Sequence, residues 1–247
     1  MRGSQVTIKD IARELKISPS TVSRALKNHP DISKKTKAAV NELAQKYGYR
    51  RNPIALSLLQ SKSNIIGVVI PEIVHFFFSS IISGIEDVAS RAGYNVMICQ
   101  SNESYEREIE TVQALSASRV DGLLISVSKN TYEFDHLKDL ENVGIPVVFF
   151  DRVCQEIDTH KVVIDDFNGA FQAVEHLISI GRKRIAHLSG PQNLLIGKKR
   201  LEGYLHALKK HDLPIDENLI INCDTFDKAL KSTPALYEMD NPPDAIF

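Results

Sequence analysis

Apolar residues recur at helical spacing in two short stretches near the start of the chain, which predicts two consecutive helices. The first covers residues 7–15, and its apolar face consists of Ile8, Ile11, Ala12 and Leu15. The second begins at Pro19, behind Ser18, whose hydroxyl can cap free backbone N–H groups. Its apolar face consists of Val22, Ala25 and Leu26. Two short helices joined by a tight turn are typical of a helix-turn-helix that reads the DNA major groove, although the pair alone also fits an ordinary helical hairpin.

The remaining faces of the second helix carry small polar and basic side chains. Ser20, Thr21, Arg24 and Lys27 lie off its apolar face and are free to meet a partner. Because hydroxyl and guanidinium groups bond to base edges, we predict that Ser20, Thr21 and Arg24 read DNA bases. Pro19 has no N–H donor, so it can offer only an apolar contact, such as one to a thymine methyl group.

Two further helices are predicted before the first linker. Ser33 can cap a helix whose apolar stripe is Val40, Leu43, Ala44 and Tyr47, and Gly48 is placed to end it. Residues 52–60 form a fourth helix, capped by Asn52 and with Pro53 at its first position. A helix this short is marginal in water, so it needs a partner surface to stay folded. Residues 61–64 read as a linker, which predicts a domain boundary near residue 62.

From Ile65 onward, short apolar strands alternate with amphipathic segments. The predicted strands cover residues 65–70, 94–99, 122–126, 147–150, 162–164, 184–189, 219–222 and 244–247. The predicted helices cover residues 77–91, 105–117, 131–142, 167–179, 194–211 and 226–238, and Pro234 weakens the case for the last. This alternation predicts an α/β fold with doubly wound parallel sheets. Since no helix follows the strand that ends at Phe247, we expect a C-terminally truncated chain.

The charge of the chain is divided unevenly. Residues 1–62 contain 13 Lys and Arg and four Asp and Glu, a net charge of +9, whereas the remainder carries −10. A basic first quarter on an acidic body predicts that one end meets a polyanion, although a solvated basic face is the alternative. Lys35 belongs to this basic set and is a predicted phosphate contact.

Several classes of protein do not fit the sequence. No apolar run approaches the ~20 residues of a membrane helix, and no signal sequence precedes residue 20, so we expect a cytoplasmic protein. Cys99, Cys154 and Cys223 lack metal-ligand spacing and are expected to be reduced thiols. Neither a zinc-protease nor a nucleophile-elbow motif occurs, so we expect no enzyme, no cofactor and no metal.

A series of short motifs gives the chain a family resemblance. They are residues 7–12 (TIKDIA), 18–26 (SPSTVSRAL), 47–53 (YGYRRNP), 66–71 (IGVVIP), 120–124 (VDGLL), 146–152 (PVVFFDR), 185–191 (IAHLSGP) and 200–204 (RLEGY). In this order, from Val6 to Phe247, they resemble the LacI/GalR family of lac-repressor-type bacterial transcription regulators. The resemblance implies a DNA-binding headpiece over residues 1–62 with a hinge helix over 52–60. Two subdomains like those of periplasmic binding proteins would follow, over residues 63–151 and 152–247, the second of them incomplete.

The expected effector site lies between these subdomains. Ligands of doubly wound sheets bind beyond the carboxyl ends of the strands, where Asp151, Arg152 and Arg200 are placed. A carboxylate and a guanidinium suit a ligand rich in hydroxyl groups, although Asp151 and Arg200 can equally form a structural ion pair. The resemblance adds Phe77 and Phe78 as aromatic pocket residues. The family commonly has Asn-Pro where this chain has His75-Phe76.

The resemblance also implies a homodimer on a palindromic operator, acting as a repressor under the control of a small molecule, for which we expect a carbohydrate. It adds Thr7, Ser23, Asn52, Ala55 and Leu58 to the predicted DNA contacts. Leu58 would be wedged between base steps in the minor groove, with Leu56 and Leu59 as alternatives. A ligand-binding protein of periplasmic type without DNA function is the competing interpretation, against which the basic headpiece and the missing export signal both argue.

Overall fold

A computed structural model describes residues 6–49, 62–74 and 76–247. The chain divides into two compact units, Met1–Ser61 and Lys62–Phe247. The hinge helix predicted over residues 52–60 lies outside the described residues. Within the parts that the structure describes, no helix is long and apolar enough to cross a membrane.

The first unit is a bundle of helices α1 (Ile8–Leu15), α2 (Pro19–Leu26) and α3 (Lys34–Lys46). One core joins them, made by Ile11, Ala12, Val22, Ala25, Val40, Leu43 and Ala44. Ser18 and Ser33 cap α2 and α3, each accepting a backbone N–H at 3.1 Å. Tyr47, which we predicted to lie in the apolar stripe of α3, instead donates its hydroxyl to Glu14 and so ties α3 to α1.

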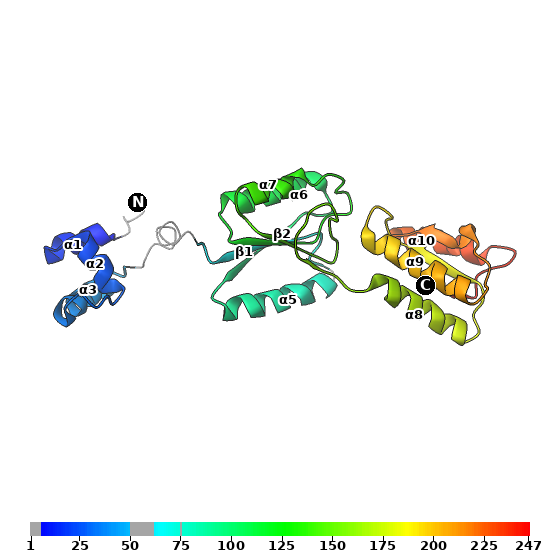
Figure 1. The fold of residues 1–247 in the computed structure, drawn as a ribbon, viewed down its shortest axis with the longest axis horizontal. Helices are drawn as coiled ribbons and strands as arrows, with labels where there is room; N and C mark the ends of the chain where they lie inside the picture. Colours follow the sequence, from blue (N-terminus) through cyan, green and yellow to red (C-terminus); the bar gives the residue numbers. More distant parts are fainter. Residues whose placement is uncertain (1–5, 50–61, 75) are drawn as a thin grey trace. The chain divides into compact units, whose positions relative to one another are not determined.

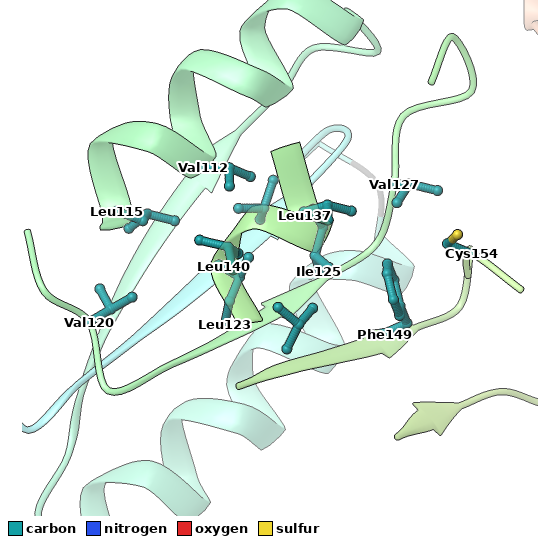
Figure 2. Close-up of a cluster of buried hydrophobic side chains, with 12 residues drawn as sticks. Val112, Leu115, Val120, Leu123, Ile125, Val127, Leu137, Leu140, Phe149 and Cys154 are labelled. Atoms are coloured by element: carbon teal, nitrogen blue, oxygen red, sulfur yellow. The ribbon is translucent and has the colours of Figure 1, made fainter. Parts of the chain in front are cut away.

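The second unit begins with a five-stranded parallel sheet in the order β2-β1-β3-β4-β5. The strands are β1 (Ile65–Ile70), β2 (Asn95–Gln100), β3 (Gly122–Ile125), β4 (Val147–Phe150) and β5 (Lys161–Val162). Helices α6 (Tyr105–Ala117) and α7 (Asp135–Asn142) cover one face, and α5 (Phe76–Arg91) covers the other (Figure 1). Figure 2 shows the larger core of this part, where leucines and valines of α6 and α7 pack on β3 and β4.

The second sheet is smaller and also parallel, in the order β7-β6-β8. Its strands are β6 (Ile185–Ser189), β7 (Ile220–Asn222) and β8 (Ala245–Ile246), and a short 3-10 turn, Glu217–Leu219, precedes β7. Helices α8 (Asp166–Ser179) and α9 (Leu195–Lys210) pack together on the face of Ile185. Helix α10 (Phe226–Tyr237) packs on the opposite face, with Leu236 against Ala186. The predicted α/β class with doubly wound parallel sheets is therefore confirmed.

Two details differ from the sequence prediction, and a third, the helix predicted over 226–238 despite Pro234, is confirmed. The strand predicted over 162–164 is β5 at Lys161–Val162, and it extends the first sheet, so that sheet continues beyond the subdomain boundary we placed after residue 151. The helix predicted from residue 131 begins at Asp135, because Ser128 and Thr131 bond to a buried carboxylate instead. Helix α10 continues through Pro234, since the burial of Leu236 in its last turn outweighs one lost backbone hydrogen bond.

The contact between α8 and α9 depends on Gly203. A Cβ atom added at this position would lie 2.4 Å from the carbonyl oxygen of Phe167 and 2.9 Å from the Cβ atom of Ala170. We expect Gly203→Ala to lower the free energy of unfolding by about 1–3 kcal/mol, because the two helices must move apart. Gly84→Ala in α5, which meets nothing within 4 Å, is the matched control and should instead stabilise by about 0.5–1 kcal/mol. Urea unfolding of both variants measures the difference, and equal effects would contradict the close approach.

Candidate functional site

Helix α2 presents a polar and basic surface on the first unit. Val22 and Ala25 are buried, whereas Pro19, Arg24 and Lys27 are exposed. Ser20 is exposed as well, and Thr21 and Ser23 are half-buried. The residues predicted to meet DNA on this helix are therefore brought together on one side of the bundle, with Lys35 exposed on α3.

The hydroxyl groups at the start of α2 form a local cluster. The Ser18 hydroxyl lies 2.7 Å from that of Ser20 and 2.8 Å from that of Thr21, while also accepting the Thr21 N–H. Both predicted base-reading hydroxyls thus have a partner before any ligand arrives. Contact with a base would exchange one hydrogen bond for another, which limits its net free-energy gain and favours specificity over affinity.

Three carboxylates of residues 6–49 have partners other than the exposed basic side chains of this surface. Asp10 accepts the backbone N–H of Thr7 at 3.0 Å and its hydroxyl at 2.7 Å, and these bonds hold the pKa of Asp10 below its usual range. Glu14 binds the Tyr47 hydroxyl, and Asp31 lies 3.3 Å from His29. Among the described residues no carboxylate pairs with the basic side chains Arg24, Lys27 and Lys35. Their positive charge therefore remains available to a polyanion.

Four of the predicted DNA contacts, and one lysine outside that set, need further comment. The Thr7 hydroxyl already donates to Asp10, so Thr7 caps α1 in this structure. Asn52, Ala55 and Leu58 lie outside the described residues. Lys37, by contrast, has a structural contact, since its ammonium group donates to the Asn28 carbonyl at 3.3 Å.

In the second unit, Asp151 directly follows β4 at the carboxyl end of the first sheet. Its backbone is in the left-handed region, with φ of 57°, and the Ser126 hydroxyl lies 3.4 Å from its carboxylate. Burial raises the pKa of Asp151, against the opposing effect of the nearby Arg152 and Arg200 guanidinium groups. We call the five-stranded sheet with its helices the first sheet layer and the three-stranded sheet with its helices the second. The structure thus brings Asp151, in the first sheet layer, within electrostatic reach of Arg200, in the second.

Arg200 on α9 has a partner that the sequence did not predict. Its Nε atom donates to Asp166 at 2.8 Å, and Asp166 is buried in the first turn of α8. The direct ion pair of Arg200 is therefore with Asp166 rather than with Asp151. The only sign of this ion pair in the sequence was the presence of two adjacent acids, Asp165 and Asp166, at the start of a helix.

A cavity of about 380 Å³ lies beside this ion pair, between β6 and the first turns of α8 and α9. Its lining includes Asp166, Arg200 and His187. The His187 ring is buried and stacks between the rings of Tyr204 and Phe247, each 5.0 Å away. Burial lowers the pKa of His187, so the imidazole is neutral near pH 7. Its two ring nitrogens have no hydrogen-bond partner within the described part of the chain.

Phe77 and Phe78, two of the predicted effector residues, lie next to each other at the start of α5. Phe78 is 4% exposed and packs in the core with Val68, Ile82 and Phe150, so its place in the effector site stays a prediction. Phe77 is half-exposed and 5.3 Å from Phe78 in an edge-to-face contact, so of these two residues it is the one that offers a ring to a ligand.

Arg152, like Arg200, is a predicted effector residue that has a structural partner. Its Nη1 atom lies 2.8 Å from both carboxylate oxygens of Glu103. We therefore assign Arg152 to the support of the site and not to its surface.

Lys129, in the loop after β3, connects the two sheet layers. Its ammonium group lies 2.9 Å from Asp224, which follows β7, and its carbonyl accepts the Asn193 amide at 2.6 Å. Hydrogen bonds from Lys228 and then Lys129 lower the pKa of Asp224 to about 2. No cluster of potential metal ligands occurs in residues 6–49, 62–74 and 76–247.

Comparison with known proteins accounts for both units. Residues 63–247 match the family described as periplasmic binding proteins and sugar binding domain of LacI family, and residues 7–52 match bacterial regulatory proteins, lacI family. Catabolite control protein A of Priestia megaterium is 34% identical, over 98% of this chain and 73% of that protein. The ribose operon repressor of Halalkalibacterium halodurans is also 34% identical, over 98% and 70%.

Solved structures share the fold. The lac repressor dimer bound to operator and the anti-inducer ONPF aligns with a TM-score of 0.78 at 23% identity, over 98% of this chain and 73% of that one. The complex of the transcriptional regulator CelR with cellobiose aligns with a TM-score of 0.66 at 26% identity, over the same shares. The chain thus spans about 70% of the length of the relatives it matches.

Proposed function

Because the chain belongs to the lacI family of bacterial regulatory proteins, we propose that it represses transcription by binding a palindromic operator as a homodimer under the control of a sugar or sugar derivative. The observation that carries this proposal is the surface of α2, where base-reading side chains share a face with unpaired positive charge. The two curated relatives named above are both regulators, which supports repression over transport.

The DNA contacts are assigned to two classes. The proposed set is Thr7, Pro19, Ser20, Thr21, Ser23, Arg24, Lys27 and Lys35, with Asn52, Ala55 and Leu58 beyond the described residues. Ser20, Thr21 and Arg24 read base edges, because they lie at the exposed start and side of α2. Lys27 and Lys35 contact phosphates, which fixes the register of the protein on DNA without reading sequence.

The effector site is assigned to the carboxyl ends of the strands. Asp151 and Arg200 bind ligand hydroxyl groups from the two sheet layers, and Asp166 orients the Arg200 guanidinium. Phe77 offers an apolar surface for a sugar ring. The cavity beside Arg200 has room for part of a ligand, and the neutral His187 at its wall can donate or accept one hydrogen bond.

A ligand-binding protein without DNA function is not favoured, because residues 7–52 match the regulatory headpiece. Like its regulatory relatives the protein acts on a DNA operator and needs no catalytic group. Since bacterial operators lie in the cytoplasm, we place its activity there.

Two substitutions separate base reading from phosphate contact. We expect Arg24→Ala to weaken binding to the selected operator by about ten- to hundredfold and to relax preference at one base pair, because a guanidinium–base pair contributes roughly 1–3 kcal/mol of discrimination. Lys35→Ala should weaken operator and random DNA by similar factors. The operator is first selected from random duplex DNA with the whole chain, and affinities are then measured at fixed salt. If the two variants exchange behaviours, the proposed recognition face is wrong.

A further inference from the structure

The loop after β3 makes two bonds to the second sheet layer, and both involve Lys129. Its ammonium group lies 2.9 Å from the Asp224 carboxylate, 95 positions later in the chain. Its main-chain carbonyl accepts the side-chain amide of Asn193 at 2.6 Å. Asn193 follows β6 and Asp224 follows β7, so one residue of the first layer holds two separate loops of the second.

The same loop is fixed to its own layer by two carboxylates of the chain segment that starts α6. Glu103 accepts the backbone N–H of Lys129 at 2.8 Å and is itself paired with Arg152. Glu108, which is fully buried, accepts the Ser128 N–H at 2.6 Å. Leaving such a group unpaired in the interior is costly, so the loop cannot follow the second layer if the two layers separate. Separation must therefore break the bonds of Lys129.

The ion pair is placed where charge attraction is effective. The Asp224 side chain is 8% exposed and that of Lys129 26%, so solvent screens this pair less than an ordinary surface pair. Asp224 is also paired with Lys228, which lies four residues later on α10. Lys228 thus holds the Asp224 carboxylate in place with or without Lys129. Lys129 is therefore the partner that can leave when the two layers separate.

We propose that Lys129 acts as a latch that holds the two sheet layers closed on each other and sets how much of the protein is closed before effector binds. Its role in regulation rests on the proposed function, because Asp151 and Arg200 approach the effector from the same two layers. When only the closed form binds tightly, apparent affinity falls in proportion to the closed fraction. Lys129 is a positioning residue in this scheme and needs no contact with the effector.

Hydrogen–deuterium exchange of the whole chain tests the latch without any ligand. We expect Lys129→Met to speed amide exchange in residues 189–194 and 222–225 by about three- to tenfold, the effect of a partly buried ion pair. Lys129→Arg, which keeps the cation, should restore most of the protection. Raising NaCl from about 50 to 500 mM should speed exchange in the same loops of the unaltered chain, but not in Lys129→Met.

Lys228→Met is the matched control, because it removes the other lysine of the same carboxylate but leaves both layers connected. Exchange in residues 189–194 should then stay unchanged. The latch is excluded if Lys129→Met exchanges like the unaltered chain, or if Lys228→Met speeds residues 189–194 equally. Duplex DNA binding is measured separately on the unaltered chain, and its absence would count against the proposed function and not against the latch.

Discussion

A variant that begins at Ile65 is expected to bind no duplex DNA, whereas the whole chain should bind with an affinity that falls steeply as salt rises. Residues 1–62 hold a net charge of +9 and the remainder −10, so the second unit alone is repelled by phosphates. If a dimer makes at least six phosphate contacts, affinity should decrease about a thousandfold between roughly 50 and 200 mM salt. No carboxylate neutralises Arg24, Lys27 or Lys35 within the described residues, which supports a slope this steep.

Fluorescence anisotropy with a labelled random-sequence duplex measures both effects. The circular dichroism and urea unfolding of the Ile65 variant show whether its α/β unit is intact, so that lost binding is not mistaken for lost structure. Duplex binding by a folded Ile65 variant would contradict a DNA-reading headpiece. A flat salt dependence of the whole chain would contradict it independently, even if the shorter variant does not fold.

Most of the fold could be predicted because local pattern and tertiary packing agree. The strands at 65–70 and 147–150 and the helix at 105–117 have the predicted bounds, since apolar runs and capping residues mark both ends. The bounds of β5 were predicted wrongly, because a strand of two residues shows no alternation of apolar and polar positions. Only its backbone hydrogen bonds to β4 make it a strand. The route of α10 through Pro234 depends on burial that no local signal reveals.

The candidate sites likewise differ in how far the local sequence could predict them. The surface of α2 was predictable, because caps and spacing within one helix decide which side chains are exposed. The pair of Arg200 and Asp166 joins positions 34 apart, and that of Lys129 and Asp224 joins positions 95 apart, so only the fold brings them together. The burial of Phe78 was predictable from the sequence, because it shares helical spacing with Ile82 and that face of α5 packs in the core.

Asp151→Asn is expected to weaken effector binding by about ten- to hundredfold and yet to raise the stability of the protein near pH 7. Hydrogen bonds from a charged group to a ligand contribute roughly 1.5–3 kcal/mol, and the amide replaces that group with a neutral one of the same shape. Binding to operator without effector should remain nearly unchanged. The effector is found first, by calorimetry of the unaltered chain with pentoses, hexoses, disaccharides and nucleosides.

The opposite sign of the two effects comes from the raised pKa of Asp151. A carboxyl group whose pKa is higher in the folded protein binds more protons there than in the unfolded chain, so the protein gains stability as pH falls through that raised pKa. At neutral pH the buried charge is a cost, which the amide removes. Effector affinity should change the other way, decreasing as pH falls and the carboxylate is protonated.

Arg200→Ala should abolish the effector response, and because it leaves Asp166 buried without its cation, it should also lower the stability of the protein. The two variants therefore distinguish ligand contact from structural support. Urea unfolding between about pH 4 and 8, beside calorimetry on the same samples, gives both quantities. If Asp151→Asn lowers stability at neutral pH while effector affinity persists, Asp151 is a structural residue and the effector site lies elsewhere.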